Sequence, residues 1–227
     1  MAINNNLETI QQRISAAAIK AGRPIESVKL IAVSKTKPMS LINEAWEAGQ
    51  VDFGENRVQE LREKSTELPQ AHWHMIGGLQ RNKVKYIAPF IHLIHSVDSP
   101  RLLKEINKQA KANERIINCL IQVNISNEDV KSGVEDENEL MQLLNDIDSY
   151  PHVHIQGLMG MASFTSNQEV IRSQFRRLRV ASEAAKSIVH PRITLNELSM
   201  GMSGDFELAI EEGATMVRIG SSVFGHR

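Results

Sequence analysis

One lysine in the sequence lies at the end of an apolar run and could act as a nucleophile. In KLIAVSKTKP, residues 29–38, the segment 30–33 reads as a buried strand, and Lys35 comes two residues after it. Such a lysine is either a solvated strand end or a reactive amine delivered to a pocket. Lys37 would share its face if the strand continued that far, and its positive charge would then favour the neutral, nucleophilic form of Lys35.

Glycines and serines gather in two short segments near the end of the chain. SMGMSGD (199–205) and RIGSSVFG (218–225) each contain or follow an apolar run. Glycine lets backbone N–H groups approach an anion and serine adds hydroxyl donors, so the pattern indicates a phosphate site. Ordinary turn chemistry would select the same residue types. The candidate phosphate contacts are Gly201, Ser203, Gly220, Ser221 and Ser222.

Arg218 is a third candidate, because a guanidinium at a strand end stays charged and can only donate hydrogen bonds. It either binds a ligand or forms an ion pair with a nearby glutamate or aspartate. A reactive amine, an anion cradle and an arginine together suggest pyridoxal 5′-phosphate as cofactor. Its aldehyde would meet Lys35, its phosphate the glycines and serines, and its ring nitrogen Arg218.

The elements that would position these residues alternate regularly along the chain. Eight short apolar segments read as strands, at about 28–34, 51–54, 72–76, 91–97, 116–125, 153–159, 193–199 and 215–219. Helical stretches lie between them, at about 39–49, 56–66, 80–87, 99–112, 135–148, 168–187 and 204–212. The pattern predicts an α/β protein, a single-domain (β/α)8 TIM barrel over residues 1–227. An open doubly wound sheet is the main competitor, but no G-x-G-x-x-G follows the first strand.

An amphipathic helix precedes the first strand. Leu7, Ile10, Ile14, Ala17 and Ala18 recur at helical spacing, and Gly22 is typical of a helix end. The segment is polar and resembles neither a secretory signal nor a transit peptide. We therefore expect an extra N-terminal helix on the barrel.

Composition excludes several classes of partner. Lys plus Arg number 26 against 27 for Asp plus Glu, and aromatic residues make up only 4%, so we expect no nucleic-acid partner. No apolar run approaches the ~20 residues that span a bilayer, so we expect no membrane partner either. Cys119 is the only cysteine and has apolar neighbours, which favours a buried thiol in a reducing, cytoplasmic setting.

Two histidine pairs have the same-face spacing of metal ligands on a strand. These are His72 with His74, and His152 with His154. The first pair reaches a strand end and the second begins a strand, which places them at opposite faces of a barrel. We therefore expect no metal site, although a metal-dependent hydrolase using His72 and His74 stays an alternative.

Seven motifs in order closely resemble the pyridoxal phosphate homeostasis protein family, whose barrels are related to the N-terminal domain of alanine racemase (fold type III). They are AVSKTKP, DFGENRVQE, HWHMIGGLQRNK, VNISNEDVKSG, GLMGMA, LSMGMSGD and MVRIGSSVFGHR. The resemblance implies that Lys35 forms the Schiff base with the cofactor and that Arg218 faces its ring nitrogen. Lys37 and Lys131 match lysines associated with cofactor exchange. The other implied cofactor contacts are Asn56, His74, Ser199, Gly201, Met202, Ser203, Gly220 and Ser221.

The same resemblance implies a cofactor carrier rather than an enzyme. A donor at the ring nitrogen keeps that nitrogen unprotonated, which weakens the ring as an electron sink. Racemisation needs a second acid/base opposite Lys35, and in the related racemase it comes from another domain, which we do not expect here. The tyrosines, Tyr86 and Tyr150, are expected at the opposite face of the barrel. We expect a monomer that passes its cofactor to pyridoxal phosphate-dependent apoenzymes, with an amino-acid racemase as the alternative.

Overall fold

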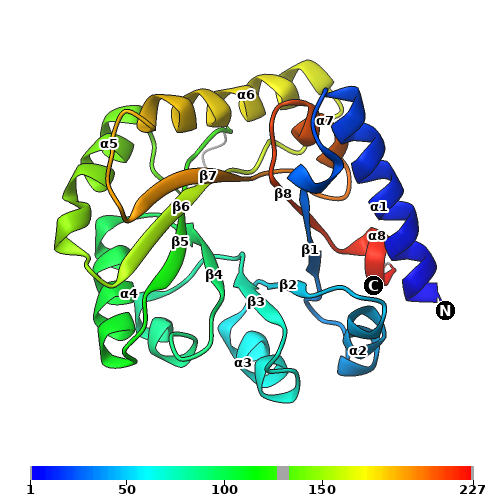
Figure 1. Cartoon of the computed structure of the whole chain (residues 1–227), viewed down its shortest axis with the longest axis horizontal. Helices are drawn as coiled ribbons and strands as arrows, with labels where there is room; N and C mark the ends of the chain where they lie inside the picture. Colours follow the sequence, from blue (N-terminus) through cyan, green and yellow to red (C-terminus); the bar gives the residue numbers. More distant parts are fainter. Residues whose placement is uncertain (1, 127–132, 226–227) are drawn as a thin grey trace.

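A closed barrel of eight parallel strands forms the centre of the computed structural model, which describes residues 2–126 and 133–225 (Figure 1). The strands follow one another around the barrel in chain order, and the last closes on the first by pairing Lys29 with Met216 and Ala32 with Ile219. The predicted (β/α)8 barrel is confirmed. The strands are β1 (Lys29–Val33), β2 (Asp52–Glu55), β3 (His72–Met75), β4 (Leu93–Val97), β5 (Ile117–Gln122), β6 (Val153–Met159), β7 (Ile193–Ser199) and β8 (Met216–Ile219).

Helices cover the outside of the barrel in Figure 1. They are α1 (Ala2–Lys20), α2 (Met39–Glu47), α3 (Val58–Glu67), α4 (Pro100–Ala112), α5 (Glu137–Asn145), α6 (Gln168–Ala185), α7 (Phe206–Glu211) and α8 (Ser221–Phe224). Short 3₁₀ helices occupy η1 (Ile25–Ser27), η2 (Arg81–Tyr86) and η3 (Asp146–Ser149). In the described ranges no helix is both long enough and apolar enough to cross a membrane.

Several short elements differ from the prediction, among them η1, η2 and α8. The stretch expected as a helix at 80–87 forms the tighter η2, and the short helix α8 was not predicted. Its sequence, Ser221–Phe224, is a single turn that glycines bound on both sides, so no periodicity was available to detect it. The turn begins where β8 ends and therefore lies next to the Lys35 segment.

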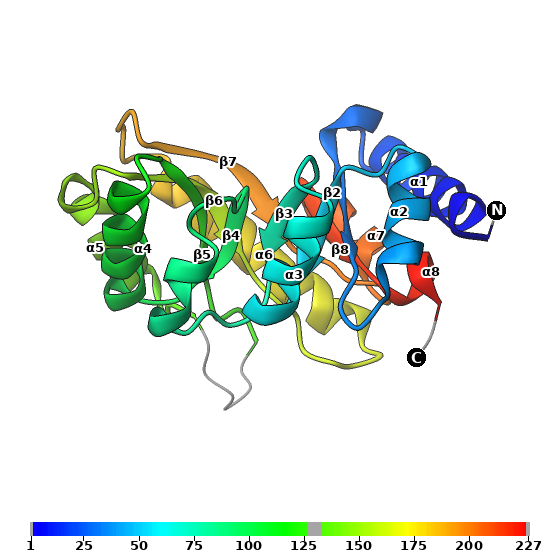
Figure 2. The same ribbon diagram turned by 90° about the horizontal axis from the view of Figure 1, so that it is seen from below.

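The N-terminal helix α1 packs against α2, α7 and α8, and Figures 1 and 2 both place it at that edge of the barrel. Its predicted apolar face is confirmed, since Ile10, Ile14 and Ala18 are each at most 2% exposed. On its polar side Arg13 pairs with Glu207, and Lys20 Nζ lies 2.7 Å from a Glu211 carboxylate oxygen. The helix thus supports α7, which follows the SMGMSGD segment.

The barrel interior holds an apolar layer and a polar layer. Five buried side chains form a cluster separate from the main core: Ile31, Leu93, Leu120, Met159 and Met216. Two residues further along the same faces of β4 and β8 lie His95 and Arg218, both buried. On these two strands the interior therefore changes from apolar to polar toward their carboxyl ends. Cys119 is fully buried, as its neighbours predicted.

Candidate cofactor site

A cavity of about 250 Å³ lies at the carboxyl ends of the strands, where Lys35 and Arg218 meet. Its lining residues are Val33, Lys35, Asn56, Ile76, Met161, Met202, Ser203, Arg218, Gly220 and Ser221. Seven of the ten cofactor contacts proposed from the sequence belong to this set. The other three, His74, Ser199 and Gly201, do not line it. The apolar wall residues Val33, Ile76 and Met161 were missed, because nothing distinguishes them from core residues in the sequence.

Lys35 is exposed and sits in a turn, not in a continuing strand. Strand β1 ends at Val33, and Thr36 has a φ of 64°, so the strand alternation stops before Lys37. The condition under which Lys37 would share a strand face with Lys35 is therefore not met. Lys37 Nζ instead donates hydrogen bonds to the carbonyl oxygens of Phe224 (3.1 Å) and Gly225 (2.9 Å).

A second opening of about 460 Å³ continues from the cavity toward Lys37. Val33, Lys35, Gly220 and Ser221 line both spaces, and Lys37 lines only the second. Together the two spaces give a small ligand access to Lys35 from solvent. Lys131, the other lysine that the resemblance implicates, lies outside the described residues.

A buried ionic network fixes the turn that carries Lys35. Lys64 Nζ donates to the Ser34 carbonyl (2.7 Å) and to Glu55 Oε1 (2.7 Å). The same ammonium contacts Glu60, and Glu60 accepts the Thr36 backbone N–H. Glu55 also accepts the Ser34 hydroxyl at 2.6 Å. Both backbone groups that flank Lys35 are thereby anchored to α3.

Burial dominates the electrostatics of Glu55. It raises the pKa of this carboxyl above the ordinary value, although the hydrogen bond from Lys64 acts in the opposite direction. Lys64 is 6% exposed, so the network is shielded from solvent. Sequence reasoning missed Lys64, and the only available signal was its spacing of four residues from Glu60 on one helix.

Arg218 forms a buried wall of the cavity. Its Nη1 donates to Ser199 Oγ at 2.6 Å, its Nη2 donates to the Gly160 carbonyl at 3.2 Å, and its backbone N–H donates to the Gly201 carbonyl at 3.0 Å. Burial lowers the pKa of the guanidinium to about 10, so it is charged at neutral pH. Among the described residues no carboxylate lies within ion-pair distance of it. Its charge is therefore available to a ligand.

A chain of hydrogen bonds runs from Arg218 across the barrel interior. Ser199 Oγ lies 2.8 Å from His95 Nδ1, and His95 Nε2 lies 2.9 Å from His74 Nδ1. His74 Nε2 then meets Asp52 Oδ1 at 2.9 Å. Burial lowers the pKa of both histidines, so each ring is neutral at pH 7.

The carboxylate at the end sets the direction of this chain. Burial opposes the charge of Asp52, but the hydrogen bond from His74 leaves its pKa below the ordinary value. An ionised carboxylate only accepts, so His74 Nε2 donates to it and His74 Nδ1 accepts from His95. His95 Nδ1 then accepts the Ser199 hydroxyl, whose oxygen accepts from Arg218. His74 and Ser199 thus belong to the hydrogen-bonded chain behind Arg218 and do not line the cavity.

Gly201 and Gly220 allow close packing of the two loops. Gly201 has a φ of 94°, and a Cβ there would lie 2.6 Å from the Ala209 Cβ. A Cβ at Gly220 would lie 3.1 Å from the Val33 carbonyl oxygen. Gly220 also donates its backbone N–H to Ser203 Oγ at 3.4 Å, which joins the loops after β7 and β8. Ser222, another candidate, does not line the cavity.

The histidine cluster and the cavity occupy different ends of the barrel. Asp52, His74 and His92 offer possible ligand atoms within 4.8 Å of one another, and Asp52 begins β2, whereas the cavity lies where strands end. None of the residues that line the cavity is a histidine, cysteine, aspartate or glutamate. The cavity therefore offers no side chain that could help His72 and His74 to bind a metal, as the alternative hydrolase would require.

One tyrosine lies elsewhere than expected. Tyr86 lines a neighbouring cleft with Asn56 and Gly78, which follow the carboxyl ends of β2 and β3, so its predicted place at the opposite face is wrong. The prediction assumed a full helix before β4, whereas η2 is short and stays near the ends of the preceding strands. Tyr150 directly precedes the segment leading into β6 and is buried. Neither tyrosine lines the cavity.

Comparison with known proteins agrees with this arrangement. The family model "Alanine racemase, N-terminal domain" matches residues 2–227. The pyridoxal phosphate homeostasis protein of Haemophilus influenzae is 40% identical over 231 residues, covering 100% of this chain and 97% of that protein. That of Aquifex aeolicus is 43% identical over 223 residues, covering 97% and 96%.

A solved structure of the same family was determined with pyridoxal phosphate (PLP). PipY of Synechococcus elongatus PCC7942 with PLP bound has a TM-score of 0.82 and 34% identity, covering 98% of this chain and 100% of that chain. The shared barrel and the sequence identity over the full length both place this chain with these proteins. The chain belongs to the pyridoxal phosphate homeostasis proteins, within the alanine racemase N-terminal domain family.

Proposed function

We propose that the cavity binds pyridoxal 5′-phosphate covalently through Lys35 and that the protein holds this cofactor for intracellular homeostasis. The observation that carries the proposal is the convergence of Lys35 and the charged Arg218 in one cavity of about 250 Å³. The relatives named for pyridoxal phosphate homeostasis and the PipY structure with bound PLP support it.

The lining residues match the parts of this cofactor. The Lys35 nitrogen would condense with the aldehyde carbon, forming a C=N bond and releasing one water. Ser203, Gly220 and Ser221 supply small side chains and hydroxyl donors suited to the phosphate. Arg218 would donate to the ring nitrogen, and Met202 and Asn56 would flank the ring.

The same residues favour a carrier over an enzyme. Bound pyridoxal phosphate supplies an electrophilic aldehyde and an electron-withdrawing ring, and it withdraws most when the ring nitrogen is protonated. Arg218 is a donor and stays charged, so it favours the unprotonated nitrogen. The lining includes no second acid/base group besides Lys35, since its other polar residues are Asn56, Ser203, Ser221 and Arg218. We therefore propose that the protein has no substantial catalytic activity.

An amino-acid racemase is the second candidate, because the family model is that of a racemase domain. The two functions are separated by incubating the loaded protein with L-alanine or L-serine and following the chiral product. A kcat above ~1 per second would contradict the carrier proposal.

The binding proposal is tested by the absorption spectrum of the protein titrated with pyridoxal 5′-phosphate. Wild type should develop a near-visible band that Lys35→Ala loses, while Lys37→Ala keeps it because Lys37 lines only the outer opening. Absence of the band in wild type would overturn the proposal. A band that survives in Lys35→Ala would move the attachment to another lysine.

The expected monomeric state, the cytoplasmic location and the apoenzyme recipients stay predictions. Light scattering on the eluted protein measures the first. Transfer to a recipient is measured by mixing the loaded protein with an apoenzyme and following the gain in that enzyme's activity. Protein whose bond to the cofactor has been reduced with borohydride is the control, because it cannot release the cofactor.

A further inference from the structure

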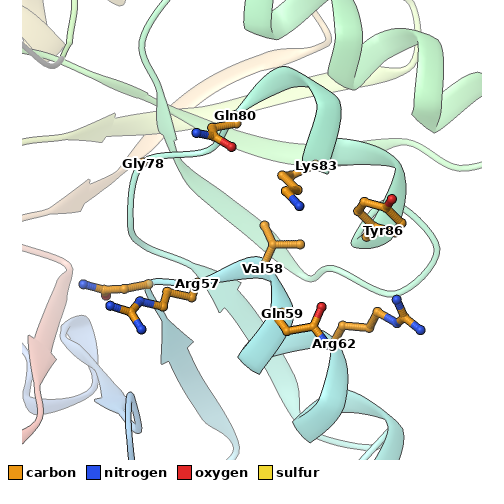
Figure 3. Close-up of a pocket in the computed structure, with 9 residues that line it drawn as sticks. Arg57, Val58, Gln59, Arg62, Gly78, Gln80, Lys83 and Tyr86 are labelled. Carbon is orange, nitrogen blue, oxygen red and sulfur yellow. The ribbon is translucent and has the colours of Figure 1, made fainter.

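A separate cleft of about 420 Å³ opens beside the cofactor cavity, between α3 and η2 (Figure 3). Asn56 lines both spaces, so the cleft adjoins the cavity without sharing Lys35 or Arg218. Figure 3 shows Gln80 and Lys83 on one side facing Val58 and Gln59 on the other. Apart from Asn56, the residues that line the cleft have no part in the function proposed above.

The charged side chains that line this cleft are all positive. Arg57, Arg62 and Lys83 line it, and none of its lining residues is acidic. Within the described residues none of these three cations has an ion-pair partner. The chain as a whole carries a formal net charge of −1, so this concentration of positive charge is local. Unneutralised cations around a cavity attract an anionic ligand.

Tyr86 gathers cations at one end of the cleft. The Arg62 Cζ and the Lys83 Nζ lie 5.9 Å and 5.7 Å from the ring centroid, and the Lys85 Nζ lies 5.0 Å from it. Cation–π attraction of this kind holds the side chains near one another despite their like charges. Arg62 and Lys83 therefore place their positive charges at the Tyr86 end of the cleft before a ligand arrives.

Neutral donors complete the lining. Helix α3 begins at Val58, and the preceding Arg57 side chain makes no capping hydrogen bond to it. Val58 and Gln59 of the first turn line the cleft, so the positive end of the helix borders it. The side-chain amides of Gln80 and Gln59 lie beside it, and the Gln59 amide also donates to Glu63 Oε1 at 2.6 Å. Arginine forks, an ammonium and amide donors are the combination that proteins use for phosphate groups.

We propose that this cleft binds the phosphate group of a small phosphate monoester, at a site separate from Lys35. A volume of about 420 Å³ exceeds what an inorganic phosphate would fill and leaves room for an attached ring. The ring could belong to a free vitamin B6 phosphate or to a nucleoside monophosphate, which share this chemistry. The site needs no aldehyde and no covalent bond.

The test uses protein whose cofactor site has been filled and reduced with borohydride, with the filling checked by absorbance. Failure to fill would concern the proposed function only, and the unfilled protein would then be titrated directly. Pyridoxine 5′-phosphate, which lacks the aldehyde, and adenosine 5′-monophosphate are titrated by calorimetry. We expect at least one of them to bind with a stoichiometry of one, more weakly at high salt. The tighter of the two identifies the source of the phosphate.

Substitutions decide whether the cleft is the site. Lys83→Gln and Arg62→Gln should each weaken binding about tenfold, because each removes a charge-assisted hydrogen bond. Lys108→Gln, on the exposed side of α4, is the matched control and should leave binding unchanged. Absence of binding by both ligands, or equal binding by wild type and the two cleft variants, would overturn the proposal.

Discussion

Arg218 and Ser199 are joined by a buried hydrogen bond of 2.6 Å, from the guanidinium Nη1 to the serine oxygen. The serine hydroxyl in turn donates to His95 Nδ1. Arg218, which lines the cofactor cavity, is thereby linked to Asp52 inside the barrel by a chain of hydrogen bonds. The orientation of Arg218 is therefore set from within the barrel.

Replacing Ser199 with alanine should disturb the site without removing any cavity-lining residue. Arg218 loses one acceptor and His95 Nδ1 loses its donor, so we expect a loss of about 1–3 kcal/mol in the free energy of unfolding. The absorption band of the bound cofactor should shift as well, because Arg218 is less firmly oriented. Ser222→Ala serves as the control. A Ser199→Ala protein with unchanged stability and an unshifted band would contradict the positioning role.

Removing Lys64 should destabilise the fold strongly. In Lys64→Met the buried Glu55 loses its cationic partner, and we expect a cost of about 3–5 kcal/mol in chemical denaturation. The double variant Lys64→Met/Glu55→Gln should recover part of this loss, because no uncompensated carboxylate remains. Equal stability of the single and double variants would show that Glu55 is not charged in the folded protein.

Acidification should destabilise the protein through its buried histidines. Burial lowers the pKa of His74 and His95, and it lowers that of half-buried His92 from 6.5 to about 4. Unfolded chains take up protons on these rings near pH 6.5 while the folded protein does not, so the stability that is present above pH 6.5 is lost as pH falls toward 4.

The contribution of His92 can be isolated by substitution. His92→Gln should flatten the decline in the free energy of unfolding between pH 6.5 and 4, by on the order of 2 kcal/mol after allowing for the partial exposure of the ring. Urea titrations at several pH values measure this. Parallel pH profiles for wild type and variant would contradict the assignment.

Cys119 should be inert in the folded protein. Its thiol is fully buried, and burial raises its pKa far above the ordinary value, so the reactive thiolate is not formed. In native buffer an aromatic disulfide reagent should modify this thiol no faster than the protein unfolds. In denaturant the same reagent should modify it immediately. Rapid modification under native conditions would show that the barrel opens around β5.

Much of the fold follows from periodicity. Each of the eight strands lies where an apolar run alternates with a helical stretch, and the strand bounds agree within a few residues. Local pattern could not reveal α8 or the true place of Tyr86, because both depend on how short turns pack against strand ends. Long-range packing decided those details.

The candidate site was predictable where residue chemistry is distinctive. Lys35, Arg218 and the loop residues Gly220 and Ser221 do meet in one cavity. The position of His74 was not predictable, because a strand histidine can point to the barrel interior or to its mouth, and pairing with Asp52 and His95 decides which. The role of Lys64 in holding the Lys35 turn was not predictable for the same reason, because its contacts come from the turn after β1, from β2 and from α3.

The most direct test of Lys35 as the attachment point is to trap the cofactor chemically and locate it. The protein is loaded with pyridoxal 5′-phosphate, reduced with borohydride, digested, and analysed by mass spectrometry. We expect the phosphopyridoxyl mass on the peptide that contains Lys35, and its loss in Lys35→Ala. The same mass on a different lysine of the wild-type protein, or on none, would contradict the assignment of Lys35.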